Sequence, residues 1–222
     1  PYDYQVEALA RTHAWAERSL AEVKRLRATR PDKPYQALFG VLQGANYEDL
    51  RKQTAEFLGA MDFDGYGIGG ALEKETMAQT IQWVNQILPE NKPRHLLGIS
   101  EPDDIFAAIE QGIDTFDCVS PTRVARNGAA YTPFGRVNVR GQKYRELFEP
   151  IMEDCDCYTC RHYTAAYLCH LLHARESLAG TLLSIHNERF IVKLVDDICA
   201  SLEDGTFYEF REAFLHKYYA KS

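Results

Sequence analysis

Short apolar segments that alternate with helical patterns constrain the fold of this chain more than any other feature. The apolar segments are residues 37–42, 65–70, 95–99 and 114–119, and the helical patterns are residues 4–27, 46–60, 74–88 and a helix that begins at Pro102. Apolar strands separated by helices are typical of parallel sheets whose strands are covered on both faces. The order therefore predicts an α/β fold with a parallel sheet, as in a doubly wound sheet or half of a (β/α)8 barrel.

The pattern changes after Val119. Residues 120–150 are expected to be irregular, apart from a hairpin of residues 129–132 and 136–140 around Pro133-Phe134-Gly135. Residues 162–179, 181–202 and 205–219 have helical periodicity. We therefore divide the chain into a half-barrel at residues 1–119, a segment at 120–150, and a helical subdomain at 151–222.

The string Cys-Asp-Cys-Tyr-Thr-Cys places three cysteines within six residues: Cys155, Cys157 and Cys160. Thiolates this close cannot all pair as disulfides, and they suit a zinc ion, which needs a fourth ligand. The candidates downstream are His162, His170, His173 and His186. We favour His186, because a ligand on the second predicted helix would be pre-positioned for the cysteine loop to close over it. The spacing does not exclude the others.

The remaining cysteines and the hydropathy of the chain bear on its compartment. Six cysteines argue for thiols and metal in a reducing, cytoplasmic compartment rather than for a disulfide framework. Cys169 and Cys199 lie in apolar helical patterns and are expected to be buried. No run of about 18 apolar residues is present, so no membrane span is expected.

The distribution of charge predicts a local anion-binding surface. The net charge of −7 by itself argues against nucleic acid. Between Cys118 and Arg145, however, there is no acidic residue, and the basic residues there are Arg123, Arg126, Arg136, Arg140, Lys143 and Arg145. Such a basic stretch in an acidic chain favours phosphate binding.

Chemistry in parallel α/β folds gathers where the strands end. The residues at the predicted strand ends are Gln43, Gly69, Gly70, Leu97, Gly98 and Asp117. A Gln carboxamide can pair with a planar heterocycle, and paired glycines allow a ligand to approach the backbone. Asp117 could be a nucleophile, a base or a metal ligand, and a capping or ion-pairing role is equally open.

Several of these motifs resemble one family in order along the whole chain. The string from Asp117 to Gly128, Asp-Cys-Val-Ser-Pro-Thr-Arg-Val-Ala-Arg-Asn-Gly, resembles the signature of the tRNA-guanine transglycosylases, or queuine tRNA-ribosyltransferases, of the bacterial type. The cysteine cluster followed by His186, the Phe39-Gly40-x-x-Gln43-Gly44 string and residues 65–70 are similar to further motifs of this family.

The resemblance implies an interrupted TIM barrel with a zinc subdomain. It implies a homodimeric pentosyltransferase that exchanges the wobble guanine of certain tRNAs for 7-aminomethyl-7-deazaguanine or queuine. Asp117 would then be the nucleophile that forms a covalent ester with the ribose. Gln43, Gly69, Gly70, Leu97 and Gly98 would contact the base. The tRNA would be contacted by Arg123, Arg126, Arg136 and Arg140. A structural zinc would be held by Cys155, Cys157, Cys160 and His186.

The chain also departs from the family pattern. The string Gly69-Gly70-Ala71-Leu72-Glu73-Lys74-Glu75 is shorter than usual, so either Glu73 or Glu75 could supply the expected acidic residue. The first half of the barrel, with its general-base Asp, is expected upstream of Pro1. We therefore expect the 222-residue chain alone to be inactive and poorly folded, because an open half-barrel exposes strand edges.

Other functions compete with this one. The chain could be a non-catalytic partner subunit of the family, although Asp117, Arg123 and Arg126 are all present. It could be a zinc-stapled RNA-binding module without catalysis. A different α/β glycosyl-transfer enzyme with a small substrate is a third alternative, but a small substrate does not need the basic stretch.

Overall fold

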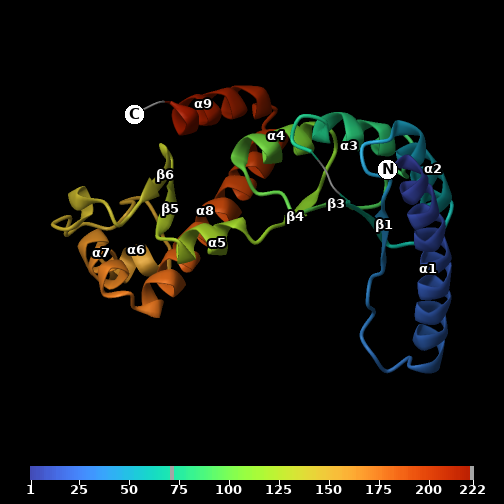
Figure 1. Cartoon of the computed structure of the whole chain (residues 1–222), viewed down its shortest axis with the longest axis horizontal. Coiled ribbons are helices and arrows are strands. Elements are labelled where there is room, and N and C mark those ends of the chain that lie inside the picture. Colours follow the sequence, from blue (N-terminus) through green and yellow to red (C-terminus); the bar gives the residue numbers. More distant parts are fainter. Residues whose placement is uncertain (71–72, 221–222) are drawn as a thin grey trace. The chain divides into compact units, whose positions relative to one another are not determined.

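The computed structural model describes residues 1–70 and 73–220 (Figure 1). The chain divides into two compact units, Pro1–Asp117 and Cys118–Ser222. Each unit contains buried apolar clusters of its own. Among the described residues, no helix combines the length and apolar character that crossing a membrane requires.

The first unit alternates helices and strands, as the sequence predicts. Its elements are α1 (Tyr2–Thr29), β1 (Phe39–Leu42), α2 (Glu48–Gly59), β2 (Gly65–Ile68), α3 (Met77–Asn85), β3 (Arg94–Leu97), α4 (Pro102–Glu110) and β4 (Thr115–Asp117). The strands form one sheet in the order β1-β2-β3-β4, and every neighbouring pair is parallel. The predicted α/β class with a parallel sheet is confirmed.

The two faces of this sheet differ in their surroundings. Leu42, Ile68 and Leu96 are neighbours on one face and are fully buried. They belong to a cluster that also includes Leu20 from α1, Leu58 from α2, Ile81 from α3 and Ala108 from α4. On the other face, Val41, Leu97, Thr115 and Asp117 are exposed. The helices of the first unit thus pack on one face, and the strand-end side chains alternate onto the other.

Asp64 joins the loop before β1 to the start of β2. Its carboxylate accepts hydrogen bonds from the backbone N–H of Leu38 and from Nη2 of Arg27, each at 2.7 Å, and from the hydroxyl of Tyr35. Burial alone would raise the pKa of Asp64, but the bonds from Tyr35, Leu38 and Arg27 outweigh it and lower the pKa to about 2.

The second unit is built around one long helix. Its elements are α5 (Ser120–Arg126), β5 (Ala129–Thr132), β6 (Gly135–Asn138), the 3-10 turn η1 (Gln142–Tyr144), α6 (Tyr158–His162), α7 (Ala165–Ala174), α8 (Ser177–Glu203) and α9 (Phe207–Tyr219). Strands β5 and β6 form the predicted antiparallel hairpin, although β6 begins at Gly135 and ends at Asn138. Helix α8 contacts α5, α6, α7, β5 and α9.

Two predictions about the secondary structure of the second unit are wrong. Residues 120–126 are helical, because Pro121 starts α5 and Ala125 is buried against the second unit's core. The helix predicted over residues 162–179 is interrupted twice. The Thr164 hydroxyl accepts the N–H of Tyr167 and starts α7, and Arg175 adopts a left-handed conformation at φ 60° that ends it.

The cysteines outside the cluster divide between core and surface. Cys169 is buried, as predicted, but Cys199 is exposed. The core face of α8 near its end is formed by Leu194, Ile198 and Ser201. Cys199 lies about 100° around the helix from Ile198 and therefore leaves that face.

Candidate active site and metal centre

The three clustered cysteines and His186 form one buried group in the second unit. Their ligand atoms all lie within 4.8 Å of one another. Nδ1 of His186 is 3.7 Å from Sγ of Cys155, 3.7 Å from Sγ of Cys157 and 3.3 Å from Sγ of Cys160. The other candidates, His162, His170 and His173, are exposed. Four donors that converge in this way could hold a metal ion.

His186 is oriented by its second ring nitrogen. Its Nε2 is 2.8 Å from the backbone carbonyl oxygen of Tyr131, which can only accept a hydrogen bond. Nε2 must therefore carry the proton, and in the neutral ring Nδ1 presents its lone pair to the sulfur atoms. The N–H of Tyr131 donates to Oδ1 of Asn187 at 2.9 Å, so consecutive residues of α8 hold both polar groups of one peptide residue in β5.

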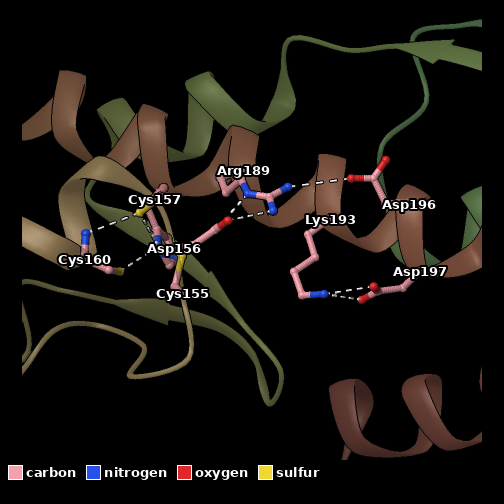
Figure 2. Close-up of polar contacts among 9 residues, drawn as sticks. Cys155, Asp156, Cys157, Cys160, Arg189, Lys193, Asp196 and Asp197 are labelled. Atoms are coloured by element: carbon pink, nitrogen blue, oxygen red, sulfur yellow. Dashed lines mark hydrogen bonds and ion pairs between the residues drawn. The ribbon is translucent and has the colours of Figure 1, made fainter.

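Figure 2 shows the surroundings of the cysteines. Arg189 of α8 makes a two-pronged ion pair with Asp156, at 2.6 and 2.9 Å, which ties the cysteine loop to the helix. Hydrogen bonds from the Cys155 and Cys160 thiols lower the pKa of Cys157 to about 3. Hydrogen bonds of the Cys160 thiol to Cys155 and Cys157 raise the pKa of Cys160. The cluster thus favours a thiolate, which is the form that binds metals.

The predicted base-binding residues meet at the carboxyl edge of the first unit's sheet. Gly70 has φ +76°, and a Cβ built on it would lie 2.2 Å from Oε1 of Gln43, so the Gln43 carboxamide lies directly against this glycine. A Cβ on Gly69 would lie 2.6 Å from Cδ1 of Leu97. The N–H of Gly98 donates to the carbonyl of Asp117 at 2.9 Å. The two glycines therefore provide the space that Gln43 and Leu97 occupy.

Asp117 ends β4 with an exposed side chain. Its Oδ1 is 2.9 Å from Nε2 of His95, and Nδ1 of His95 is 2.8 Å from the hydroxyl of Thr115. His95 lies opposite Thr115 in the β3–β4 pair, and Leu97 lies opposite Asp117. All four side chains therefore project from one face of the sheet. A carboxylate in this position can accept hydrogen bonds, bind a cation or attack an electrophile.

Arg51 is a functional candidate that the sequence reasoning missed. It lies on α2, is fully buried, and donates to the carbonyl oxygens of Ala45 at 2.6 Å, Gly69 at 2.8 Å and Gly70 at 2.7 Å. Burial lowers the pKa of Arg51 to about 10. The side chain joins the loop after β1, which carries Gln43, to the loop after β2. A buried cation that binds only carbonyl groups is invisible in a sequence, because Arg in an amphipathic helix is normally exposed.

The four predicted tRNA-binding arginines lie in the second unit and are exposed. Arg123 and Arg126 are on α5, three residues apart and so on one side of that helix. The guanidinium of Arg136 lies 5.6 Å from the centre of the Tyr131 ring. Arg140 donates to the carbonyl of Leu172 at 2.5 Å, which gives it a structural role as well.

Asn187, which the sequence reasoning also missed, fixes α5 to the rest of its unit. Its side chain is fully buried and donates to the carbonyl oxygens of Pro121 at 3.0 Å and Ala129 at 3.1 Å. These bonds hold the first turn of α5 and the start of β5. The alternatives for the family's acidic residue, Glu73 and Glu75, are both exposed, and the adjacent Ala71 and Leu72 lie outside the described residues.

Comparison with known proteins relates nearly the whole chain to one family. The family described as queuine tRNA-ribosyltransferase matches residues 1–220. Among the relatives, the queuine tRNA-ribosyltransferase of Symbiobacterium thermophilum is 45% identical over 222 residues, which cover 99% of this chain and 54% of the relative. That of Lactococcus lactis subsp. lactis is 46% identical over 221 residues, covering 98% of this chain and 56% of the relative.

A third relative, the queuine tRNA-ribosyltransferase of Streptococcus pneumoniae (strain Hungary19A-6), is 45% identical over 227 residues, covering all of this chain and 58% of the relative. The chain therefore spans about half the length of the curated relatives it matches. With a match to the family over nearly all of its residues, the chain belongs to the queuine tRNA-ribosyltransferase family.

Proposed function

We propose that the protein carrying this chain is a pentosyltransferase that exchanges the wobble guanine of tRNA for a 7-deazaguanine, in the formation of queuosine. The observation that carries the proposal is the grouping of Asp117 with Gln43, Gly70 and Leu97 at one edge of a parallel sheet, in a chain of this family. A carboxylate beside a surface suited to a planar base can act on a nucleoside. The incoming base would be 7-aminomethyl-7-deazaguanine or queuine.

We propose that the four parallel strands are the C-terminal half of a TIM barrel. The packing of α1–α4 into one cluster with one face of the sheet supports this arrangement, because a barrel has its helices outside and strand side chains inside. Asp117 and Leu97 then belong to the inner face, at the carboxyl end where barrel enzymes bind their substrates.

The exchange would proceed in two displacements at the ribose C1′ atom. One oxygen of Asp117 attacks C1′, a bond forms between them, and the bond from C1′ to N9 of guanine breaks with its electron pair passing to guanine. The incoming base, deprotonated at the equivalent nitrogen, then attacks C1′, and the electron pair of the ester bond returns to Asp117. Two displacements retain the configuration at C1′, as in retaining glycosidases.

Base recognition would fall to the strand-end residues. The Gln43 carboxamide offers a donor and an acceptor to the edge of the base, and Leu97 provides an apolar wall. Gly98 leaves open space in which the base can approach the backbone, and Gly69 and Gly70 make room for the side chains of Leu97 and Gln43. Arg51 holds the two loops that carry Gln43 and Gly70, and so sets the spacing of the recognition groups without touching the base.

The tRNA would be bound through Arg123, Arg126, Arg136 and Arg140. Because a base must leave its stack before chemistry at its glycosidic carbon, the enzyme needs contacts that hold the neighbouring nucleotides. Exposed arginines in a segment without acidic residues suit phosphates and the edges of unpaired bases. By resemblance, the protein would act as a homodimer in the cytoplasm.

We propose that Cys155, Cys157, Cys160 and His186 hold a structural zinc ion. Ligand bonds of about 2.3 Å to sulfur and about 2.0–2.1 Å to nitrogen in a tetrahedron separate sulfur from nitrogen by about 3.6 Å. The observed separations of 3.3 to 3.7 Å support this fit. Four protein ligands leave no position for water, so the ion would brace the cysteine loop against α8 rather than take part in catalysis.

The test is to trap the covalent intermediate. Full-length protein is mixed with tRNA and a guanine analogue that cannot complete the exchange, and the products are separated on a denaturing gel. We expect a protein–tRNA band with the native sequence and none with Asp117→Asn. Asp114→Asn is the matched control, because Asp114 is exposed directly before the strand that Asp117 ends, and its bond to the Arg94 N–H survives the change.

The outcomes separate the alternatives. Loss of the band in Asp117→Asn, with tRNA affinity retained, supports catalysis by Asp117. Binding of tRNA by the native protein without any band would contradict the proposal and favour a non-catalytic partner subunit or an RNA-binding module. An equally strong band from Asp117→Asn would assign the nucleophile to another residue.

A further inference from the structure

His95 and Thr115 form a hydrogen-bonded chain that ends on the side chain of Asp117. The three residues come from two neighbouring parallel strands and share one face of the sheet. Nδ1 of His95 is 2.8 Å from the Thr115 hydroxyl, and Nε2 is 2.9 Å from Oδ1 of Asp117. The imidazole therefore has a partner on each nitrogen, and its orientation is fixed at both ends.

The partners determine where the imidazole proton resides. An ionised Asp117 can only accept hydrogen bonds, so Nε2 must carry a proton to make the 2.9 Å contact. In neutral His95, Nδ1 is then an acceptor, and the Thr115 hydroxyl can donate to it. The opposite tautomer would place the lone pair of Nε2 against a carboxylate. The Asp117 carboxylate thus selects the tautomer, and the Thr115 hydroxyl, which can donate as well as accept, is compatible with it and holds the other ring nitrogen.

We propose that His95 is a positioning residue for the nucleophile and that the Thr115 hydroxyl holds its ring in place. This inference rests on the proposed function of Asp117. The Nε2–H group holds Oδ1, which leaves Oδ2 as the oxygen that attacks C1′. The Asp117 side chain is 61% exposed and that of His95 25%, so solvent alone would not fix the carboxylate rotamer. The bond to His95 supplies that restraint.

The same hydrogen bond has a role in the second displacement. Once Oδ2 is bonded to C1′, Oδ1 is the carbonyl oxygen of the ester. When the incoming base attacks, the C1′–Oδ2 bond breaks and its electron pair returns to the carboxylate. A donor already in place on Oδ1 stabilises this returning charge. His95 neither gains nor loses a proton in either step, so no further reactant is needed.

The test measures the two displacements separately in full-length protein. Adduct formation is followed in a single turnover with tRNA, and adduct release is followed after a 7-deazaguanine is added to the trapped species. We expect His95→Leu to slow release by about tenfold, because a hydrogen bond to a charged group is typically worth that factor or more. His95→Gln, whose carboxamide N–H can reach Oδ1, should recover much of the rate. Affinity for tRNA should not change.

Two controls separate positioning from a structural effect. His216→Leu makes the same substitution at an exposed histidine of α9 and should leave both rates unchanged. Thr115→Val keeps the shape of the side chain but removes the hydroxyl, and it should slow release by a few fold. In this variant the ¹⁵N signal of Nδ1 should move because this nitrogen loses its hydrogen bond, while Nε2 stays protonated.

The spectroscopic measurement distinguishes this inference from the proposed function. If the native protein forms no adduct but His95 is protonated at Nε2 and its signals respond to Asp117→Asn, the proposed function fails and the hydrogen-bonded chain stands. If the adduct forms and His95→Leu releases it at the native rate, the inference is wrong and the proposed function stands. Protonation of neutral His95 at Nδ1 alone would also overturn the inference.

Discussion

Replacement of Arg51 by methionine would test how the base-binding edge is held together. The methionine keeps an apolar stem of similar length, but it leaves the carbonyl groups of Ala45, Gly69 and Gly70 without their donor. Arg51 is 0% exposed, so water cannot simply replace the guanidinium where it is most deeply enclosed. The change therefore isolates the contribution of one buried cation.

The magnitude follows from two opposing contributions. The three short hydrogen bonds from this charged donor are together worth about 4–9 kcal/mol. A fourth, to the carbonyl oxygen of Leu42, is longer at 3.4 Å. Burial lowers the pKa of Arg51 from 12.5 to about 10, which corresponds to a desolvation cost of about 3 kcal/mol. The difference predicts that Arg51→Met lowers the free energy of unfolding by about 3 kcal/mol, since carbonyl groups near the sheet edge will regain some water.

The measurement is urea unfolding followed by circular dichroism, with guanine affinity as a second readout. Lys52→Met is the matched control, because Lys52 is the next residue on α2 and its ion pair with Glu48, at 2.5 Å, is exposed. That control should cost at most about 0.5 kcal/mol. If Arg51→Met and Lys52→Met are equally stable, and both bind guanine as the native protein does, Arg51 does not brace the site.

Three further predictions concern stability and metal binding. The lowered pKa of Asp64 means that its contribution to stability is complete above pH 3.8 and is lost as the pH falls to about 2; Asp64→Asn should flatten this part of the stability–pH curve, and an unchanged curve would contradict the assignment. Asn187→Ala removes three buried hydrogen bonds and should lower unfolding free energy by about 3 kcal/mol in chemical denaturation, and a loss below about 1 kcal/mol would refute this. Cys160→Ser should lose bound zinc by elemental analysis while Cys199→Ser retains it; equal zinc in both variants would exclude the cluster.

Much of the first unit could be predicted from the sequence because its strands are short, apolar and separated by breakers. The parallel sense of the sheet followed from that alternation, whereas the strand order was left open between a doubly wound sheet and a half-barrel. The four metal-ligand candidates were also identifiable, since three cysteines within six residues suit metal binding far better than disulfide pairing, and the structure brings them together with His186. The strand pattern and the cysteine cluster are both local in the sequence, and the metal site needs only one distant residue, His186.

The features that escaped prediction depend on contacts between distant segments. Helix α5 has only seven residues and too little periodicity to be recognised, and it is held by Asn187, far along the chain. Arg51 and His95 have partners that only the folded sheet supplies. The sequence did contain a signal for His95. If Leu97 lies opposite Asp117 in a parallel pair, His95 must lie opposite Thr115, but this step requires the register of the two strands.

The two hydrogen bonds between α8 and the backbone of Tyr131 bear on how the protein would respond to loss of a bound metal ion. The His186 ring binds the carbonyl oxygen of Tyr131, and the Asn187 side chain binds its N–H. If β5 separates from α8, the His186 imidazole loses the hydrogen bond that orients it toward the cysteine sulfur atoms. Binding of the proposed zinc ion and docking of the hairpin would then be thermodynamically linked. Chelation should speed amide hydrogen exchange across residues 129–138 before α8 itself unravels, making the Arg136-bearing hairpin a reporter of metal supply.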